Sequence, residues 1–272
     1  MSVIKIENLV RDYGEGKGVF DVSFQVNRGE AFGFLGPNGA GKTTTIRHLM
    51  GFLRPKSGRC TIEGRDCWKE RDSIQAKLGY IPGEISFFDD MSGAEFLKFV
   101  AEYRKIGAQG RQRELLERFD LNPGGKIKKM SKGMKQKLGI VAAFMHDPDI
   151  LILDEPTSGL DPLMQKRFVE FVAEEKKRGK TILMSSHMFE EVERTCDRIG
   201  MIQEGKMAVV DSAAALRKRH VRQYTVTLND RDDAEAFARD FDGICDGLAV
   251  TVTTKQSLEE IFMEYYGGKK HD

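Results

Sequence analysis

The chain has 272 residues, of which 40% are hydrophobic and 31% are charged, as is ordinary for a soluble globular protein. Its 43 basic and 42 acidic side chains give a net charge of +1. We therefore expect no nucleic-acid partner, because proteins that bind phosphate backbones usually carry a clear basic surplus. The four cysteines form no CxxC pair, which argues against a zinc finger.

The sequence contains no apolar stretch long enough to cross a bilayer. Its first ten residues, "MSVIKIENLV", lack the basic segment and apolar run of a signal peptide. We therefore expect a cytoplasmic protein that does not itself span a membrane.

The first 35 residues contain three short runs in which apolar and polar residues alternate, "VIKIENL", "VSFQV" and "EAFGFL". Alternation of this kind predicts β-strands, and the turn-rich stretch "YGEGKG" between the first two predicts an antiparallel pair.

The next segment, Gly36 to Thr43, matches the phosphate-loop pattern GxxxxGK[ST], with a predicted strand before it and a predicted helix after it. Glycines let the backbone wrap around phosphate oxygens, and the helix N-terminus adds partial positive charge. Lys42 is expected to reach the β- and γ-phosphates, and the Thr43 hydroxyl to bind magnesium. We expect the nucleotide to contact Gly36, Pro37, Asn38, Gly39, Ala40, Gly41, Lys42, Thr43 and Thr44.

"GRCTIEGRD" (58–66) and "LGYIP" (78–82) predict two further strands, and the pattern becomes helical from residue 92 to residue 146. Ser92 and Glu95 form a capping box at the start of the first of these helices. Near the end of this region, "KIKKMSKGMKQKL" (126–138) carries six lysines. This cluster could be a nucleic-acid or membrane patch, a solvated helix face, or part of a phosphate site.

The apolar run "ILILD" predicts a buried strand that ends at Asp154 and Glu155. Ligands bind at the carboxyl edge of such sheets, so we expect Asp154 to hold magnesium and Glu155 to polarise the attacking water. The alternative is a strand end closed by solvated acids. His187 follows another buried strand, "TILMSS", and is expected to contact the γ-phosphate at the same edge.

Strands alternate with helices up to about residue 220, which predicts an α/β domain with a mostly parallel sheet. A helical subdomain at about 84–146 is inserted in it. Residues 220–272 predict a small α+β accessory domain of strand, helix, strand and helix, so the expected domains are 1–219 and 220–272.

In this order, the motifs resemble those of the ATP-binding subunit of an ABC transporter, over roughly residues 1–220. "GPNGAGKTT" resembles the Walker A loop of that family, "ILILDEP" its Walker B strand and "SGLD" (158–161) its D-loop. The resemblance implies a P-loop NTPase fold (RecA-like core, N-terminal antiparallel β subdomain), ATP and Mg²⁺ as ligands, Lys42, Glu155 and His187 as catalytic residues, and Tyr13 stacked on adenine.

"MSKGMKQKL" stands where the family carries its signature, usually LSGGQ. By resemblance, this segment contacts ATP held by a second copy of the chain in a head-to-tail homodimer, and Asp161 couples the two sites. The residues expected at this trans contact are Ser131, Lys132, Gly133, Met134 and Asp161.

Two features depart from the family pattern. Lys132 and Met134 replace the usual Gly and Gln, as in a variant found in ABC-2-type exporters, including drug exporters. In the Q-loop, Gly83 stands where a glutamine is usual, so Glu84 is the expected substitute magnesium ligand, with bridging water or altered coupling as alternatives.

The resemblance implies an ATPase subunit that drives export through a separate multi-spanning permease, peripheral on the inner face of the cell membrane. Permease contacts are expected in residues 84–105, at Phe87, Phe88 and Met91 unless these are core residues. The alternatives are a soluble ABC ATPase acting on ribosomes or nucleic acid, and a nucleotide-binding regulator that does not hydrolyse.

Overall fold

The computed structural model describes residues 1–88, 90–106, 110–219, 221–255 and 260. Its contacts divide the chain into two compact units, Met1–Val210 and Asp211–Asp272. The division therefore falls at residue 210, whereas the predicted domain boundary at 219/220 stays a prediction. Within the described residues, no helix combines the length and the apolar character needed to cross a membrane.

The centre of the first unit is a six-stranded sheet in the order β10-β9-β3-β8-β7-β6. The strand pairs from β9 through β6 are all parallel, and every residue of β3, β7 and β8 is buried. This confirms the predicted mostly parallel core sheet. Its strands are β3 (Ala31–Leu35), β6 (Leu78–Ile81), β7 (Ile150–Asp154), β8 (Thr181–Ser186), β9 (Arg198–Gln203) and β10 (Lys206–Ser212).

A second sheet, in the order β2-β1-β4-β5, is antiparallel throughout. The turn between its first two strands is shorter than "YGEGKG" suggested, because only Glu15 and Gly16 separate the strands and both have positive φ. The strands are β1 (Ser2–Gly14), β2 (Lys17–Asn27), β4 (Ser57–Ile62) and β5 (Arg65–Asp66).

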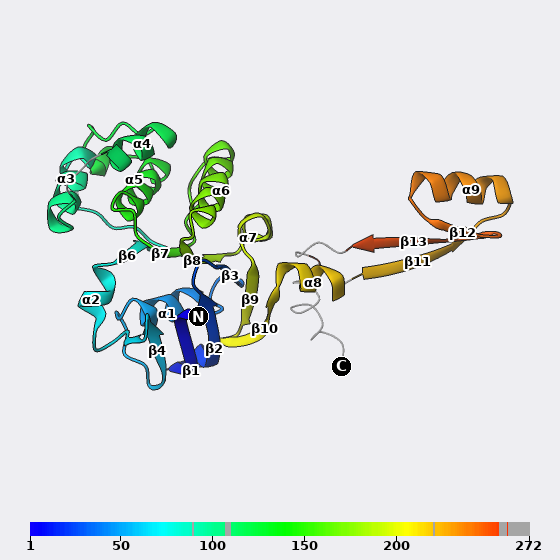
Figure 1. Cartoon of the computed structure of the whole chain (residues 1–272), viewed down its shortest axis with the longest axis horizontal. Helices are drawn as coiled ribbons and strands as arrows, with labels where there is room; N and C mark the ends of the chain where they lie inside the picture. Colours follow the sequence, from blue (N-terminus) through cyan, green and yellow to red (C-terminus); the bar gives the residue numbers. More distant parts are fainter. Residues whose placement is uncertain (89, 107–109, 220, 256–259, 261–272) are drawn as a thin grey trace. The chain divides into compact units, whose positions relative to one another are not determined.

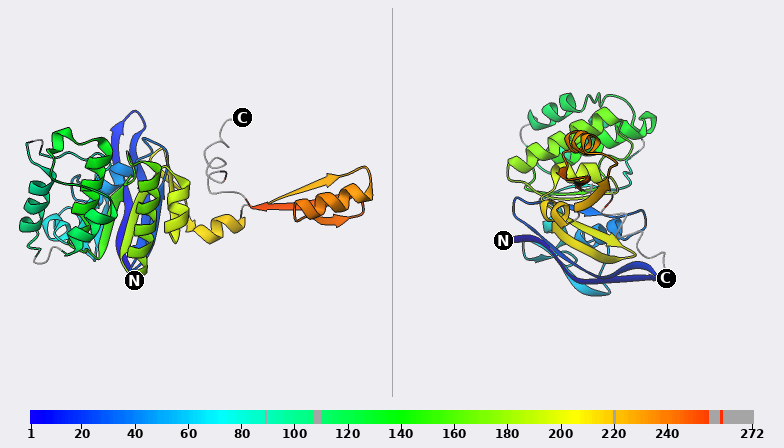
Figure 2. Two further views of the ribbon diagram at one scale, coloured as in Figure 1. Left: turned by 90° about the horizontal axis from the view of Figure 1, so that it is seen from above. Right: turned by 90° about the vertical axis from the view of Figure 1, so that its right-hand side faces the viewer.

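The helices of the first unit form layers around the core sheet (Figures 1 and 2). Helix α1 contacts strands of both sheets and lies between them, while α5, α6 and α7 lie on the opposite face of the core sheet. The helices are α1 (Lys42–Leu49), α2 (Arg71–Gln75), α3 (Gly93–Tyr103), α4 (Gly110–Arg118), α5 (Lys132–Phe144), α6 (Pro162–Lys177) and α7 (Phe189–Thr195), with a 3-10 turn at Ile127–Lys129.

The predicted capping box at the start of α3 is confirmed. Ser92 Oγ accepts a hydrogen bond from the Glu95 backbone N–H, and the Glu95 carboxylate accepts one from the Ser92 backbone N–H. The six-lysine segment that ends this helical region runs from the 3-10 turn into α5, so most of its lysines lie on one short turn and one helix.

Strand register brings three chain segments to one edge of the core sheet. Asp154 at the end of β7 pairs with Ser185 of β8, and Leu35 at the end of β3 pairs with Ser186. The carboxyl ends of parallel strands meet at the same edge, where α/β proteins bind their ligands. The loop after β3, the acidic residues after β7 and the turn after β8 therefore lie together.

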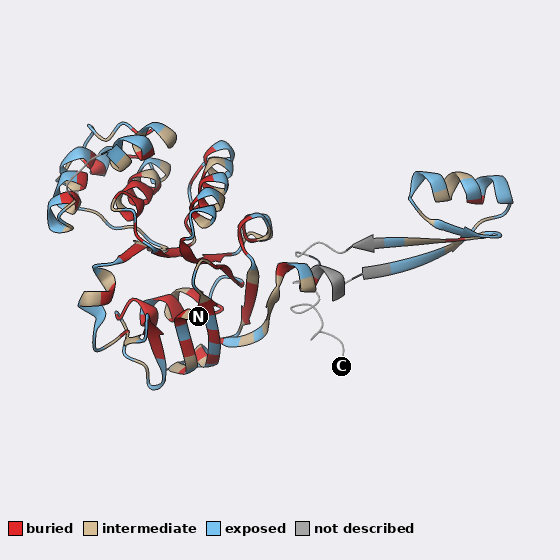
Figure 3. Ribbon diagram, viewed as in Figure 1, coloured by how far each residue is buried: buried red, intermediate tan, exposed pale blue. Residues whose placement is uncertain are grey.

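The second unit contains a three-stranded antiparallel sheet in the order β11-β13-β12, together with helices α8 and α9. Strand β12 is an addition to the predicted strand-helix-strand-helix pattern, and much of α9 is exposed (Figure 3). The expected final helix at 257–267 lies outside the described residues, apart from Glu260. The elements are α8 (Ala213–Arg219), β11 (Val221–Thr227), α9 (Arg231–Asp240), β12 (Ile244–Asp246) and β13 (Ala249–Lys255).

Candidate functional site

The loop between β3 and α1 has the tight backbone that a phosphate cradle requires. A Cβ atom added at Gly36 would lie 2.6 Å from the carbonyl oxygen of Ile202, and one at Gly41 would lie 2.8 Å from Val19. Gly41 also has φ 109°, a value that L-residues with a side chain rarely adopt. A larger residue at either position would therefore distort the loop. Pro37, Asn38 and Gly39 are exposed at its tip, and Ala40 is buried.

Lys42 is the cation of this loop, and its side chain is buried. Its Nζ donates to the carbonyl oxygens of Gly36 at 2.6 Å and Pro37 at 3.2 Å, and lies 3.2 Å from Glu155 Oε1. A buried ammonium group held by carbonyl oxygens and a carboxylate can move onto phosphate oxygens, which bind it more strongly than carbonyls do. The geometry supports the predicted phosphate contact.

Asp154 fits the predicted magnesium site. Its side chain is fully buried, Ser185 Oγ donates to Oδ1, and the Thr43 hydroxyl lies close to the carboxyl group. Burial raises the pKa of Asp154, while the hydrogen bonds from Ser185 and Thr43 act in the opposite direction. Oδ2 has no hydrogen-bond partner among the described residues. A carboxylate and a hydroxyl suit Mg²⁺, which takes oxygen ligands and commonly needs few from the protein because phosphates supply others.

The Q-loop brings Gly83, rather than Glu84, to this carboxylate. A Cβ at Gly83 would lie 3.1 Å from Asp154 Oδ2. Glu84 is exposed, and in the described parts of the chain no hydrogen bond or ion pair joins it to another residue. Its role as a magnesium ligand stays a prediction without a supporting contact.

Glu155 lies between Lys42 of the phosphate loop and His187. Its Oε2 is 3.2 Å from His187 Nδ1, as its Oε1 is from Lys42 Nζ. Its backbone φ is 46°, in the left-handed region that is uncommon for residues other than glycine. The Ser185 hydroxyl and carbonyl both accept its backbone N–H. Strained backbone of this kind clusters at functional sites.

His187 is half exposed and follows β8 directly. The structure thus joins Lys42, Glu155 and His187 in one chain of polar contacts, and Asp154 neighbours them through the strand end. A γ-phosphate placed at Lys42 would have a carboxylate and an imidazole beside it. The catalytic roles of these residues stay predictions.

The signature segment begins helix α5. Ser131 is its N-cap, and Ser131 Oγ accepts the Met134 backbone N–H at 3.2 Å. A Cβ at Gly133 would lie 2.8 Å from the carbonyl oxygen of Gly159, so this turn packs directly on the D-loop of the same chain. The methylene stem of Lys132 also covers Gly159. Ser131, Lys132 and Met134 are exposed and available to a second molecule.

Two further predicted residues lie near this machinery. Asp161 caps α6, and its Oδ1 accepts the Met164 backbone N–H at 3.0 Å. Tyr13 lies near the end of β1 and is half exposed, with the Arg11 guanidinium 5.3 Å from its ring centre. The strand pairing places Asp12, the residue before Tyr13, opposite Gly18, whose carbonyl lies close to Gly41 of the phosphate loop. An aromatic ring beside that loop suits the predicted adenine contact.

Sequence reasoning missed two polar residues of this site. Ser185 bridges Asp154 and the Glu155 backbone, and Gln136 is buried on α5 with its Nε2 donating to the Pro156 carbonyl at 2.6 Å. The available signal for Ser185 was a pair of serines ending an otherwise apolar strand. Gln136 had no local signal, because its partner is 20 residues away.

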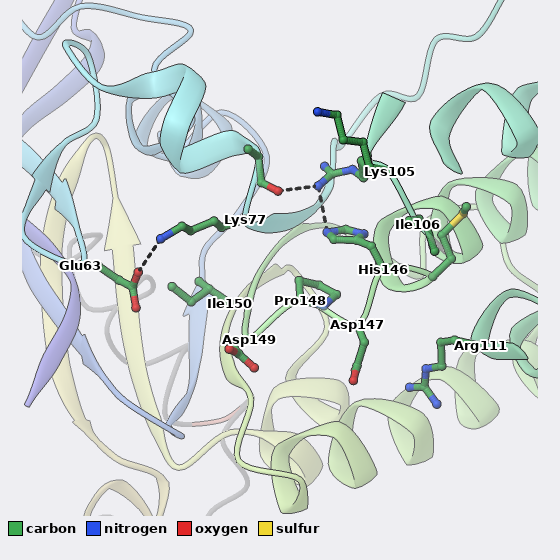
Figure 4. A pocket seen from close by; sticks show the side chains of 13 residues that line it. Glu63, Lys77, Lys105, Ile106, Arg111, His146, Asp147, Pro148, Asp149 and Ile150 are labelled. Atoms are coloured by element: carbon green, nitrogen blue, oxygen red, sulfur yellow. Dashed lines mark hydrogen bonds and ion pairs between the residues drawn. The ribbon is translucent and has the colours of Figure 1, made fainter. Parts of the chain in front are cut away.

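A separate hollow of about 700 Å³ opens at the amino ends of β6 and β7, at the opposite edge of the sheet from the phosphate loop (Figure 4). Arg104 lines this hollow and contacts His146. Its guanidinium also donates to the carbonyl of Ala76, the C-cap of α2. Burial, with the Arg104 charge next, lowers the pKa of His146 to about 4, so its imidazole is neutral near pH 7. These contacts are accounted for by packing and helix capping.

We expect Ser185→Ala to destabilise the fold and weaken metal binding. Loss of the hydroxyl leaves buried Asp154 short of a donor, which lowers the free energy of unfolding by about 1–3 kcal/mol. We expect the Mg²⁺ concentration for half-maximal ATPase activity to rise by about tenfold, as for other residues that support a metal ligand. Urea unfolding and Mg²⁺ titration measure the two effects. Ser57→Ala, at an exposed serine without a side-chain hydrogen bond in the described residues, is the control, and equal behaviour of both variants would contradict the prediction.

Comparison with known proteins agrees with this geometry. The ABC transporter family model matches residues 19–158. Linearmycin resistance ATP-binding protein LnrL of Bacillus subtilis (strain 168) is 38% identical over 80% of this chain and 71% of its own. Bacitracin transport ATP-binding protein BcrA of Bacillus licheniformis is 38% identical over 86% of this chain and 77% of its own.

Among solved structures, an ATP-binding subunit of an ABC transporter superposes with a TM-score of 0.77 and 28% identity, covering 97% of this chain and all of that one. The family match spans more than half of the chain, and the fold and phosphate edge have the corresponding form. The chain therefore belongs to the ABC transporter family, as an ATP-binding subunit with ATPase activity.

Proposed function

We propose that this chain hydrolyses ATP to drive export through a separate, multi-spanning ABC-2-type permease. The observation that carries the proposal is the single sheet edge at which Lys42, Asp154, Glu155 and His187 meet. Similarity to relatives named for bacitracin transport and linearmycin resistance supports export as the direction. The chain acts at the inner face of the cell membrane.

In this proposal, the phosphate groups of ATP bind to the backbone of the loop, and Lys42 transfers from the Gly36 and Pro37 carbonyls to the β- and γ-phosphates. Thr43 and Asp154 hold Mg²⁺, which neutralises charge on the phosphates. Glu155 orients a water molecule and accepts its proton as the water oxygen attacks the γ-phosphorus and the bond to ADP breaks. His187, fixed by its contact with Glu155, binds the γ-phosphate from the strand next to it.

The second copy of the chain completes each site. Ser131 and the first backbone N–H groups of α5 form an exposed helix N-terminus, which attracts anions. In a head-to-tail dimer these groups close over the γ-phosphate held by the partner's loop. Gly133 packs on Gly159 within one chain, so a change at the partner's γ-phosphate is transmitted directly to the D-loop that ends at Asp161.

The permease contact is proposed on α3 and the segment before it. The exposed side chains here are Phe88, Phe99 and Tyr103. Phe88 packs edge-to-face with Phe99, and Phe99 stacks with Tyr103. Of the other predicted contacts, Phe87 packs against Phe96 and is half-buried, as is Met91. Exposed aromatic patches of this kind mark protein interaction sites.

The test is affinity purification of the tagged full-length chain from membranes of its host in mild detergent. We expect a multi-spanning protein to co-purify, and Phe88→Asp to lower its yield at least about tenfold, since buried interface aromatics contribute about 2 kcal/mol or more. Phe52→Asp is a matched control, because Phe52 is also a half-exposed aromatic with an edge-to-face partner, Tyr80. Recovery of ribosomes or nucleic acid in place of a membrane protein would reject the transport assignment.

A further inference from the structure

Helix α7, which follows His187, carries a buried carboxyl group that no motif identified. Glu191 is 4% exposed, although acidic residues are almost never buried without partners. Ser186 Oγ donates to its Oε2 at 2.8 Å, and the Thr157 hydroxyl lies close enough to the carboxyl group to act against the rise in its pKa. Its Oε1 has no hydrogen-bond partner in the described part of the chain.

The partners of Glu191 stand immediately beside the two predicted catalytic residues. Ser186 directly precedes His187, and Thr157 lies two residues after Glu155. Ser186 Oγ also accepts the Met188 backbone N–H at 2.9 Å, so the turn that carries His187 is closed around the same hydroxyl. One buried carboxyl group therefore links the loop after β7 to the turn after β8.

The position of Glu191 is itself fixed by packing. The next residue, Val192, is fully buried, and its Cγ1 would be 2.2 Å from a Cβ added at Gly33 of β3. One turn further along α7, the Thr195 hydroxyl donates to the Glu191 carbonyl at 2.7 Å. Because α7 rests on the core sheet so closely, the Glu191 side chain is a fixed support for both loops.

The electrostatic surroundings agree with such a linking role. Burial raises the pKa of Glu191, and the charge of Glu155 also raises it. The hydroxyl groups of Thr157 and Ser186 and the charge of a protonated His187 act in the opposite direction. Among the described residues Glu191 has no cationic partner at hydrogen-bond distance, and a buried carboxyl group without one is costly to maintain. A leucine or alanine would pack on β3 at lower cost, so packing alone does not account for it.

We propose that Glu191 is a positioning residue that holds the His187 turn and the Thr157 loop at the spacing that ATP hydrolysis requires. The inference rests on the proposed roles of Glu155 and His187. Glu191 acts through Ser186, because its carboxyl group is buried and accepts the hydrogen bond of that hydroxyl. Its removal therefore lowers the rate of hydrolysis and leaves ATP binding at Lys42 intact.

The test is a double-mutant cycle on the full chain, with kcat and KM for Mg-ATP as readouts. We expect Glu191→Ala to lower kcat by about tenfold with KM changed by less than about twofold, because small misplacements of catalytic groups cost about one to two orders of magnitude. In a His187→Ala background the same change should lower kcat by less than about twofold, since residues that act as a unit are not additive. Glu191→Gln, which keeps the shape and an acceptor, should retain most of the wild-type kcat.

Glu190→Ala is the control on the same helix, because Glu190 is exposed and its ion pair among the described residues is the surface pair with Arg194. If Glu191→Ala does not fold, Ser186→Ala breaks the same link and replaces it in the cycle. Wild-type kcat in Glu191→Ala, or an equal loss with and without His187, overturns the inference. Undiminished turnover in His187→Ala instead removes the proposed role of the histidine, and the inference falls with it.

Discussion

Glu155→Gln should abolish ATP turnover, lowering kcat at least about 100-fold, because general bases contribute about 10²–10⁴ to rates. Glutamine keeps the size of the side chain but cannot take a proton from water. It also removes the carboxylate charge from the contacts with Lys42 and His187, each 3.2 Å from a Glu155 oxygen. ATP binding should persist, since the phosphate loop is unchanged. The variant should therefore accumulate as an ATP-bound dimer, measured by light scattering with Mg-ATP present.

The matched control is Glu63→Gln. Glu63 shares the left-handed backbone conformation of Glu155, with φ 50°, and also pairs with a cation, Arg28, at 2.9 Å. It lies in the turn between β4 and β5, outside the phosphate edge. The control variant should turn over ATP like wild type and remain monomeric between cycles. Undiminished turnover in Glu155→Gln would remove Glu155 from its assigned role.

Ser131→Arg should block hydrolysis, with kcat reduced about 100-fold or more, as when preorganised donors to a reacting anion are lost. The serine caps the exposed end of α5, and an arginine removes the cap and fills the space that the partner's γ-phosphate needs. Since the phosphate loop of the same chain is untouched, monomer binding of a fluorescent ATP analogue should be retained. Steady-state ATPase assays and equilibrium titration separate the two quantities.

Lys132→Gly, at the adjacent position, should leave hydrolysis largely intact and serves as the control. The lysine stem covers Gly159, whose φ of 82° is a conformation that glycine adopts without strain. Removing the stem uncovers the D-loop without altering the N-cap at Ser131 or the packing of Gly133. Collapse of ATPase activity in Lys132→Gly would show that the lysine ammonium group takes part directly. Retained activity in Ser131→Arg would show that Ser131 makes no trans contact.

Features that depend on neighbouring residues in the sequence were predictable. The phosphate loop, the buried strand before Asp154 and the capping box of Ser92 and Glu95 each follow from local chemistry: glycine freedom, apolar burial and the unpaired N–H groups of a helix end. The predicted meeting of Asp154 and His187 at one edge also followed, because parallel strands must align their carboxyl ends.

The role of the six-lysine segment at 126–138 was only partly predictable from the sequence. The motif order indicated that Ser131 and Gly133 belong to a phosphate contact. The packing of Lys132 over Gly159 joins segments 27 residues apart, and no local pattern encodes it.

By itself the sequence determined the family, the phosphate loop and the strand ends that carry charged residues, since these depend on residue type and spacing along the chain. The tertiary structure alone decided which polar groups support them. Ser185 reaches Asp154 from the neighbouring strand, Gly83 rather than Glu84 faces that carboxylate, and Glu191 bonds to Ser186 from a helix placed by its packing on β3. Such contacts depend on strand register and helix packing, which are set by the whole core and not by any segment of it.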